Sequence, residues 1–400
     1  MPKQITRVKW SAMDIPFGVE FDETTGTFSG APEDEGEYIV PVSVQTNYGK
    51  DTKDVVLSVE EGKNKWREIA VSNISPIYSF DTEQGVMILG SSSKTYYNPA
   101  DKTFSNKSSI DVNTYAADID PITKKWVCLG DNISKGIASP TGTHALSSMV
   151  GSIGSAHCCW SPALSQFCFV KTSFISGNPT RTGYHYSILC DIDGNPTEQA
   201  RVDNIGDFAG YYLIDYDLSV TRQTQYSGDR ICWASGNINK FVLATYQTTP
   251  TVALSADGLN WESVVIPTTV NGWLTCMFWL PEHNMLLCAQ YDRGTGNTHI
   301  YISNDGITWT KTTTLIGSYT QYPSVDTYAW LFTGDWSPTK KVFCLCGSSA
   351  SFITRDFENW DRIALPTSSI NYNWTHVRWS NIANAFLLNV LIKGLYTLKV

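Results

Sequence analysis

The sequence predicts an all-β fold in which most of the chain, residues 65–400, forms a seven-bladed β-propeller. Charged residues make up only 17% of the chain and aromatic residues 12%, with 29 glycines and 17 prolines, a composition typical of β-proteins rich in turns. A hairpin motif recurs seven times along this stretch, and a tryptophan-containing box recurs at intervals of roughly 50 residues, as expected for propeller blades. Radial repetition also explains how a chain too long for one compact core can fold.

The hairpin motif is a strand that ends in a bulky residue, followed by a tight turn and a second apolar strand. It is clearest at Trp160-Ser-Pro162, Trp279-Leu-Pro281 and Trp336-Ser-Pro338, each followed by an apolar run. Proline and asparagine at such turns preset the backbone for a chain reversal, so they are hairpin signals. Weaker copies are centred on Phe80, Ile119, Trp233 and Trp379.

The box has the pattern Ser/Thr-x-Asp-x-x-x-Trp and is expected to form the turn between the third and fourth strands of a blade. In such a turn aspartate accepts hydrogen bonds from backbone amides, glycine takes the left-handed conformation, and tryptophan packs against the neighbouring hairpin. The residues assigned this structural role are Ser255, Asp257, Trp261, Ser303, Asp305, Trp309, Thr354, Asp356 and Trp360. Degenerate versions lie at 98–104, 139–142 and 191–197. The seventh hairpin has no box after it, so one fourth strand is missing from the C-terminal end.

We expect this missing strand to come from the beginning of the repeat region. Residues 65–70, Lys-Trp-Arg-Glu-Ile-Ala, are similar to the segment Trp360-Asp-Arg-Ile-Ala364. A closed ring needs its last blade joined to its first, because an open sheet edge invites aggregation. Residues 65–71 are therefore predicted to complete the final blade.

Residues 1–60 lack the repeat and are expected to form a separate module, followed by a short polar linker at 61–64. Their second half alternates apolar and polar residues, as in a half-buried sheet. The run Gly18-Val-Glu-Phe-Asp-Glu-Thr-Thr-Gly26-Thr-Phe-Ser-Gly-Ala-Pro32 resembles the signature G-L-x-F-D-x-x-T-G-x-I-S-G-x-P of a class of immunoglobulin-like domains. This resemblance implies a small immunoglobulin-like sandwich with a shortened first strand.

The three boxes resemble the Asp-box repeats of sialidase-like propellers, and more closely the S-x-D-G-x-x-W variant common in phage and bacterial propellers. In that family the boxes are structural and usually far from any active site, so they indicate a fold and not a function. Sialidase chemistry needs an arginine triad, a Tyr/Glu nucleophile pair and an aspartic acid. The Arg-Ile-Pro motif that this family carries near the start of its propeller has no counterpart in the first blade. The similar segment Arg362-Ile-Ala lies near the C-terminal end and does not match the motif. Sialidase catalysis is therefore not expected.

Composition also argues against several other classes of protein. The net charge of −9 disfavours a nucleic-acid partner, which would require a basic patch. The first residues lack the apolar stretch of a signal peptide, so a protein made in the cytoplasm is expected. The sequence contains no run of 18 apolar residues, the length needed to span a membrane as a helix. The ten cysteines fall mostly in predicted buried strands, where they act as small hydrophobic residues.

No metal and no cofactor are predicted. The six histidines are scattered without metal-ligand spacing. The segment Asp191-x-Asp193-Gly-Asn195 hints at a calcium loop but lacks the remaining ligands, so a turn is the favoured interpretation.

Long segments at about 171–185, 200–228 and 311–328 are expected on one face of the propeller. In a four-stranded blade, the turns after strands two and four share that face, and the short turns after strands one and three share the other. Aromatic residues with polar neighbours suit stacking on sugar rings or contact with a protein, although each could instead pack its own loop. The candidate ligand-binding residues are Phe174, Arg181, Tyr184, Tyr211, Tyr212, Tyr216 and Tyr226.

These features favour a non-catalytic binding protein. An adhesion-type architecture without an export signal fits a bacteriophage virion protein, and both modules resemble parts of such proteins. The prediction is a tail- or capsid-attached protein, present in multiple copies, whose immunoglobulin-like module docks to other virion proteins. Its propeller loops would bind a host cell-surface glycan or protein. The alternatives are a purely structural virion component, a propeller glycosidase or lyase acting on surface polysaccharide, and a bacterial cytosolic scaffold.

Overall fold

The chain divides into two compact units. One comprises Met1–Asn64 together with Lys399, and the other comprises Lys65–Leu398 together with Val400. The computed structural model describes residues 8–15, 19–30, 36–59, 65–69, 76–90, 92–110, 114–130, 137–140, 142–144, 152–174, 183–202, 230–245, 249–268, 270, 272–292, 294–315, 331–347, 351–365, 375–390 and 394–400. Among these residues, no helix has the length and apolarity needed to cross a membrane.

The first unit contains a three-stranded sheet and a separate hairpin. The sheet has the order β1-β4-β5 and the hairpin pairs β2 with β3, all antiparallel. The strands are β1 (Val8–Ala12), β2 (Val19–Asp22), β3 (Thr27–Gly30), β4 (Gly36–Thr46) and β5 (Gly49–Val59). β4 and β5 pair along their whole length, from Gly36↔Val59 to Thr46↔Gly49.

Residues 19–30 of the run that resembles the immunoglobulin-like signature form the β2–β3 hairpin. The Asp22 carboxylate accepts hydrogen bonds from the backbone amides of Thr24 and Thr25 at 2.7 and 3.2 Å, which shapes the turn. Gly26 has φ +72° and lies under the ring of Trp10, where an added Cβ would be 2.8 Å from Cδ2. Only glycine satisfies both requirements, so the spacing of Asp22 and Gly26 follows from the turn geometry.

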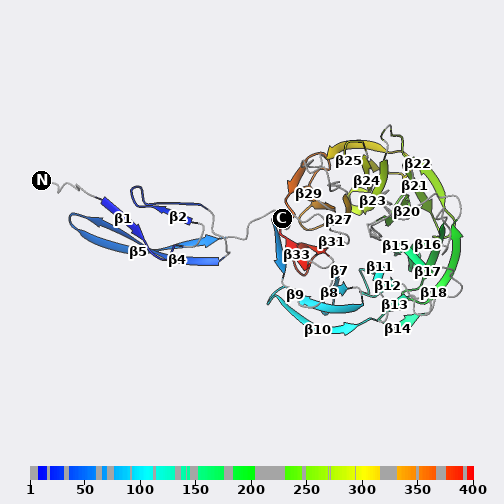
Figure 1. Cartoon of the computed structure of the whole chain (residues 1–400), viewed down its shortest axis with the longest axis horizontal. Helices are drawn as coiled ribbons and strands as arrows, with labels where there is room; N and C mark the ends of the chain where they lie inside the picture. The colour runs from blue at the N-terminus through cyan, green and yellow to red at the C-terminus, as the bar shows by residue number, and fades with distance from the viewer. Residues whose placement is uncertain are drawn as a thin grey trace, which may run out of the picture. The chain divides into compact units, whose positions relative to one another are not determined.

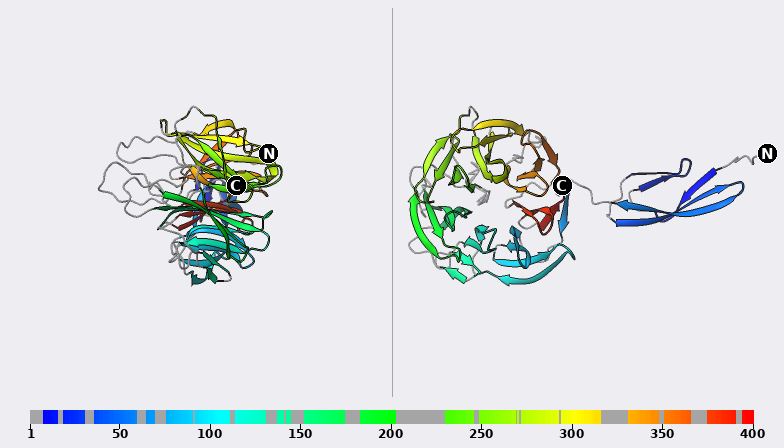
Figure 2. Two further views of the ribbon diagram at one scale, coloured as in Figure 1. Left: turned by 90° about the vertical axis from the view of Figure 1, so that its right-hand side faces the viewer. Right: turned by 180° about the vertical axis from the view of Figure 1, so that it is seen from behind.

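The second unit contains seven four-stranded antiparallel sheets among the described residues. Figures 1 and 2 show that these sheets follow one another around a ring, which is called the ring below. In chain order the sheets are β7 (Pro76–Thr82), β8 (Gly85–Gly90), β9 (Ser93–Asn98), β10 (Thr103–Ser109); β11 (Thr114–Ile119), β12 (Trp126–Gly130), β13 (Ile137–Ser139), β14 (Gly142–His144); β15 (Ser152–Ser161), β16 (Gln166–Phe174), β17 (Gly183–Cys190), β18 (Pro196–Val202); β19 (Ile231–Ala234), β20 (Lys240–Ala244), β21 (Thr251–Ser255), β22 (Glu262–Val265); β23 (Gly272–Leu280), β24 (Met285–Asp292), β25 (Thr298–Ser303), β26 (Thr310–Leu315); β27 (Leu331–Ser337), β28 (Val342–Gly347), β29 (Ser351–Thr354), β30 (Trp360–Ile363); and β31 (Thr375–Ser380), β32 (Ala385–Val390), β33 (Gly394–Leu398), β6 (Trp66–Ile69). A short 3₁₀ helix, η2 (Pro281–His283), forms the turn between β23 and β24.

The first strand of each sheet lies on the inside of the ring. Each of these strands contacts the first strand of the next sheet, and β31 of the last sheet contacts β7 of the first. Neighbouring sheets pack face to face through apolar side chains. Phe167 and Phe169 of the third sheet, for example, are fully buried against Val127 and Leu129 of the second. The ring is thus a series of similar interfaces, each with its own core.

The last sheet is completed by the strand that precedes the first one, as the sequence led us to expect. β6 pairs with β33 in antiparallel register from Leu395↔Ile69 to Leu398↔Trp66. Trp66 is only 3% exposed and packs with Val342 and Ile353 of the sixth sheet. Its indole Nε1 donates a hydrogen bond to Ser351 Oγ at 2.9 Å. One short strand therefore joins the two ends of the ring and also anchors the neighbouring sheet.

The inner edges of the first strands have no neighbouring strand within their own sheet, and side chains of adjacent sheets satisfy some of their amides. Asp118 Oδ2 accepts a hydrogen bond from the backbone amide of Trp160 at 2.7 Å. In the same way Asp335 Oδ2 accepts from the amide of Trp379 at 2.8 Å. Asp81 accepts from the Ser380 hydroxyl at 2.5 Å and from the Asn381 amide at 2.7 Å.

The cysteines form no disulfide. All ten are free, and all lie in strands; Cys158 and Cys232 are half-buried and the others are buried. Burial raises the pKa of the Cys168 thiol to about 12. These thiols act as apolar core atoms.

Candidate functional site

The ring has two unlike faces. Because each sheet is a four-stranded meander, the turns after its first and third strands lie on one face, called here the short-turn face. The connections after the second and fourth strands lie on the opposite face, the loop face. The long segments 175–182, 203–230 and 316–330 follow β16, β18 and β26, so all of them begin and end on the loop face. This agrees with the distribution expected from the sequence.

Two of the predicted ligand-binding residues lie in described strands at the loop face. Phe174 is the last residue of β16, and Tyr184 is the second residue of β17, where it pairs with Ser173. The other predicted residues, Arg181, Tyr211, Tyr212, Tyr216 and Tyr226, lie outside the described residues. The structure therefore places Phe174 and Tyr184 at one end of the same sheet.

Close to this strand end is a buried lysine that the sequence analysis did not single out. Lys171 lies in β16 and its side chain is 0% exposed. Among the described residues its Nζ has no hydrogen-bond partner, and it lies 5.9 Å from the centroid of the Tyr186 ring. Burial lowers the pKa of the Lys171 ammonium to about 8. The available sequence signal was a lone lysine directly after the apolar run from Phe167 to Val170.

A second polar group on the loop face surrounds His299 of β25. Its Nδ1 lies 2.9 Å from Thr314 Oγ1, and its Nε2 lies 3.6 Å from Asp292 Oδ2. Burial lowers the pKa of the imidazole, which favours a neutral ring at neutral pH. The Asp292 carboxylate also accepts hydrogen bonds from the Gly294 amide at 2.8 Å and the Thr295 hydroxyl at 2.6 Å. Because the carboxylate is already used by its own turn, this group fixes the β24–β25 hairpin.

The residues of the three Ser/Thr-x-Asp-x-x-x-Trp boxes all lie at turns of the short-turn face. Asp257 Oδ1 accepts hydrogen bonds from the amides of Leu259 and Asn260, both at 2.8 Å, and Trp261 Nε1 donates to the carbonyl of Gly258 at 3.2 Å. Ser255 Oγ accepts from the Gly258 amide at 2.8 Å.

The same contacts recur in the other two boxes. The Asp305 carboxylate accepts from the Thr308 amide at 2.7 Å, and the Asp356 carboxylate accepts from the Asn359 amide at the same distance. Phe357 of the third box takes the left-handed conformation, φ 62°, that glycine has in the other two. These residues build turns, which is the role expected of them.

The hydrogen bonds also explain the acidity of the box aspartates. At Asp257 burial opposes ionisation, but the hydrogen bonds from Asn260 and Leu259 outweigh it and lower the pKa to about 2. The Thr308 amide is the largest influence at Asp305 and the Asn359 side chain at Asp356, and both pKa values are again lowered to about 2.

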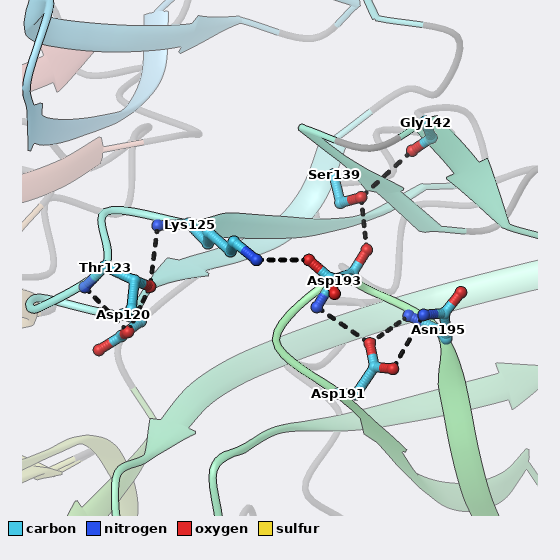
Figure 3. Close-up of polar contacts among 8 residues, drawn as sticks. All are labelled: Asp120, Thr123, Lys125, Ser139, Gly142, Asp191, Asp193 and Asn195. Atoms are coloured by element: carbon cyan, nitrogen blue, oxygen red, sulfur yellow. Dashed lines mark hydrogen bonds and ion pairs between the residues drawn. The ribbon is translucent and has the colours of Figure 1, made fainter.

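The degenerate box at 191–197 forms a turn that links the second and third sheets (Figure 3). Asp191 Oδ1 accepts hydrogen bonds from the amides of Asp193 and Asn195 at 2.9 and 2.8 Å. The Asp193 carboxylate forms an ion pair with Lys125 Nζ at 2.6 Å, and its carbonyl accepts from Ser139 Oγ at 2.7 Å. Both carboxylates are thus engaged within the protein. Within the described ranges, no cluster of three or more His, Cys, Asp or Glu is placed to hold a metal ion.

The sequence analysis also missed the carboxylates that span neighbouring sheets. Asp118 and Asp335 each directly precede the bulky residue of a hairpin motif, Ile119 and Trp336. This shared position was a usable signal, although it marks a structural role.

Comparison with solved structures identifies the architecture of the ring. The chain is similar to the beta-propeller domain of Cps50 (Swd1) from Myceliophteria thermophila, with 10% identity, a TM-score of 0.51, and coverage of 84% of this chain and 98% of that one. It is also similar to the WD40 repeats of RRP9, with 10% identity, a TM-score of 0.53, and coverage of 82% and 91%. The fold is a β-propeller. The WD40 domain of Neurospora crassa Pan2 matches the propeller with 8% identity, a TM-score of 0.51, and coverage of 84% and 96%.

These similarities concern the fold alone, because so low an identity carries no functional site with it. No protein-family model matches the sequence, and no curated protein matches it. The function of the propeller must therefore be argued from its own faces.

Proposed function

We propose that the chain is a non-catalytic bacteriophage virion protein that binds a host cell-surface glycan or protein through the loop face of a seven-bladed propeller. Each four-stranded sheet is one blade. The N-terminal unit is an immunoglobulin-like module that docks to other virion proteins, and several copies are present in a particle.

The contrast between the two propeller faces is the observation that carries this proposal. On the short-turn face, the box turns are held by their own hydrogen bonds, as at Asp257 and Asp305. On the loop face, long segments leave the ends of β16, β18 and β26. Binding residues are found disproportionately on loops positioned by a rigid scaffold. The closed ring provides such a scaffold, and the loop face carries its long connections.

Two further features support separate roles for the two units. Residues 1–64 form their own compact unit, with a core residue, Val40, that is 0% exposed. The hairpin at Asp22–Gly26 carries the signature that resembles immunoglobulin-like domains, which recur in virion proteins together with box-containing propellers. The virion context rests on this resemblance.

The non-catalytic part of the proposal is supported by how the described carboxylates are used. Asp257, Asp305 and Asp356 serve turns, and Asp118 and Asp335 bind amides of the adjacent blade. A glycosidase would need two carboxyl groups facing one substrate with a fixed separation. Each of the five carboxylates named here instead accepts a hydrogen bond from a backbone amide.

The test is binding of fluorescently labelled protein to candidate host cells, with phage adsorption measured in competition. A variant in which residues 203–229 are replaced by a short Gly/Ser linker should lose staining while keeping the circular dichroism and melting temperature of the parent. A variant with the exposed short-turn residue Ile307 replaced by serine is the matched control and should stain normally.

Other outcomes point to the alternatives. Unchanged staining by the loop variant would refute the assignment of the loop face. Absence of staining by the parent protein, with the loop face covered in the assembled particle, would favour a structural virion component. Release of new reducing ends from host polysaccharide would favour a glycosidase or lyase.

A further inference from the structure

Lys171 is a buried, charged side chain to which no described residue supplies a hydrogen-bond partner. Burying an unpaired charge is costly, and buried cations are normally paired with an anion. No carboxylate of the described residues forms an ion pair with it, so none of them supplies its counter-charge.

The strand register places Lys171 in a row with two other functional groups. Lys171 of β16 is directly opposite Tyr186 of β17, which is directly opposite Arg201 of β18. Residues directly opposite one another share a face of the sheet. Neighbouring strands are ~4.8 Å apart, so the backbones of Lys171 and Arg201 are separated by ~10 Å, with an aromatic residue between them.

Exposure increases along this row from the inside of the blade to its rim. Lys171 is buried, Tyr186 is half-buried and Arg201 is exposed. The row crosses the sheet near the loop-face ends of its strands, three residues before Phe174 ends β16 and one residue before Val202 ends β18. It therefore lies on the face where the proposed function places the ligand.

The three groups have complementary roles toward one kind of ligand. Lysine and arginine bind carboxylates by charge-assisted hydrogen bonds, and arginine can bind a carboxylate through two of its nitrogens. A tyrosine ring presents an apolar face with a polar tip. The Tyr186 centroid is 5.9 Å from Lys171 Nζ. A sugar ring stacked on Tyr186 would carry an exocyclic carboxylate toward the ammonium.

We propose that this row, Lys171, Tyr186 and Arg201, is a subsite for an acidic glycan, with Lys171 binding the carboxylate of a uronic acid residue. The inference rests on the proposed function, because it specifies the ligand class of the loop face. The glycan enters from the loop face, and its carboxylate supplies the counter-charge that no described residue provides. Arg201 binds a second acidic residue or the same chain further along.

The experiment is isothermal titration calorimetry of the full chain with a galacturonic acid oligosaccharide, compared with a neutral galactose oligosaccharide of equal length. The parent protein should bind the acidic oligosaccharide saturably and at least 10-fold more tightly than the neutral one. K171M should bind it at least 10-fold more weakly, and R201Q about 3-fold more weakly. Lys94 is the matched control, since its Nζ lies 5.1 Å from the Trp126 ring in another blade, and K94M should bind like the parent.

Folding is checked separately by thermal melting. K171M should melt at the same temperature as the parent or higher, because it replaces an unpaired buried charge with an apolar side chain of similar length. If K171M melts lower, a partner for Lys171 exists within the protein and the subsite is overturned. R201Q is an independent check on binding, because Arg201 is exposed and its replacement should change the melting temperature little.

The remaining outcomes separate this subsite from the proposed function. Equal affinity of K171M and the parent, equal affinity for acidic and neutral sugars, or tighter binding of poly-glutamate than of the oligosaccharide would each overturn the acidic-glycan assignment. If the parent stains host cells but K171M stains equally well, the subsite fails and the host-binding function stands. If the parent stains no cells yet loses acidic-sugar binding in K171M, the subsite stands and the host-binding function fails.

Discussion

Replacing Trp66 by alanine is the sharpest test of how the ring is held closed. Trp66 is 3% exposed, packs on Val342 and Ile353, and donates a 2.9 Å hydrogen bond to Ser351 Oγ. Removing a buried tryptophan side chain costs about 3–5 kcal/mol, and a typical hydrogen bond contributes about 1 kcal/mol of that. Ser351 still donates to the carbonyl of Ile363 in the variant, so no further large penalty is expected.

The loss should be measured by urea denaturation together with hydrogen exchange. We expect W66A to be less stable than the parent by about 3–5 kcal/mol, with amides of β33 losing protection first because β6 is their outer partner. W66F keeps most of the buried volume and should lose only about 1–2 kcal/mol.

Trp309 provides a control away from the closure. It is 5% exposed and belongs to a box turn of the fifth blade. W309A should be destabilised by a similar amount, about 3–5 kcal/mol, but without selective loss of protection in β33. If W66A stays within about 1 kcal/mol of the parent, or if β33 remains as protected as β24, then β6 does not hold the ring closed and the reasoning is wrong.

Three further predictions concern the contacts between blades, the box turns and the thiols. D335N should lose about 1–2 kcal/mol of stability in urea denaturation, because the Asp335 carboxylate accepts a hydrogen bond from the Trp379 amide at 2.8 Å. The control D51N, on an exposed strand of the first unit, should change stability by less than about 0.5 kcal/mol, and equal effects of the two variants would contradict a special role for Asp335. The carboxyls of Asp257 and Asp305 have pKa values lowered from 3.8 to about 2, so their contribution to the free energy of unfolding is complete above pH ~4 and is lost as the pH falls from there to about 2. D257N and D305N should make stability depend less steeply on pH in this range, and a dependence as steep as the parent's would contradict the assignment. Burial raises the pKa of the Cys168 thiol to about 12, so a thiol reagent at pH 8 should leave Cys168 unmodified in the native protein and modify it in urea. Peptide mass spectrometry measures the modification, and fast labelling of the native protein would show instead that the strand opens.

The repeat explains why so much of the fold was accessible from the sequence. The Trp160 and Trp279 hairpins became β15–β16 and β23–β24, because proline-containing turns and apolar runs act locally. Even the weak copy at Ile119 forms the paired strands β11 and β12. The similarity between residues 65–70 and 360–364 located β6, since a strand with a repeated role keeps a repeated pattern.

The candidate site was less accessible because it depends on differences between the blades. Whether Lys171 has a partner is decided by which residues of other strands surround it, and no local pattern encodes that. Asp118 and Trp160 are likewise far apart in the chain, and their hydrogen bond exists only once two blades are packed. The predicted residues Tyr211 and Tyr226 occupy a segment with no repeat to constrain it, so the sequence supplied their chemistry without their positions.

The closure of the ring by β6 also determines when, during synthesis, the ring can finish folding. β6 is translated before the other strands of the ring, yet its partner β33 is the last of them in chain order. About 330 residues separate the two strands, so at 5–20 residues per second β6 waits on the order of 15–65 s for its partner. During that interval Trp66 and an unpaired strand edge are exposed to other nascent chains. The ring therefore cannot close blade by blade, because its final pairing has to wait until β33 has been synthesised.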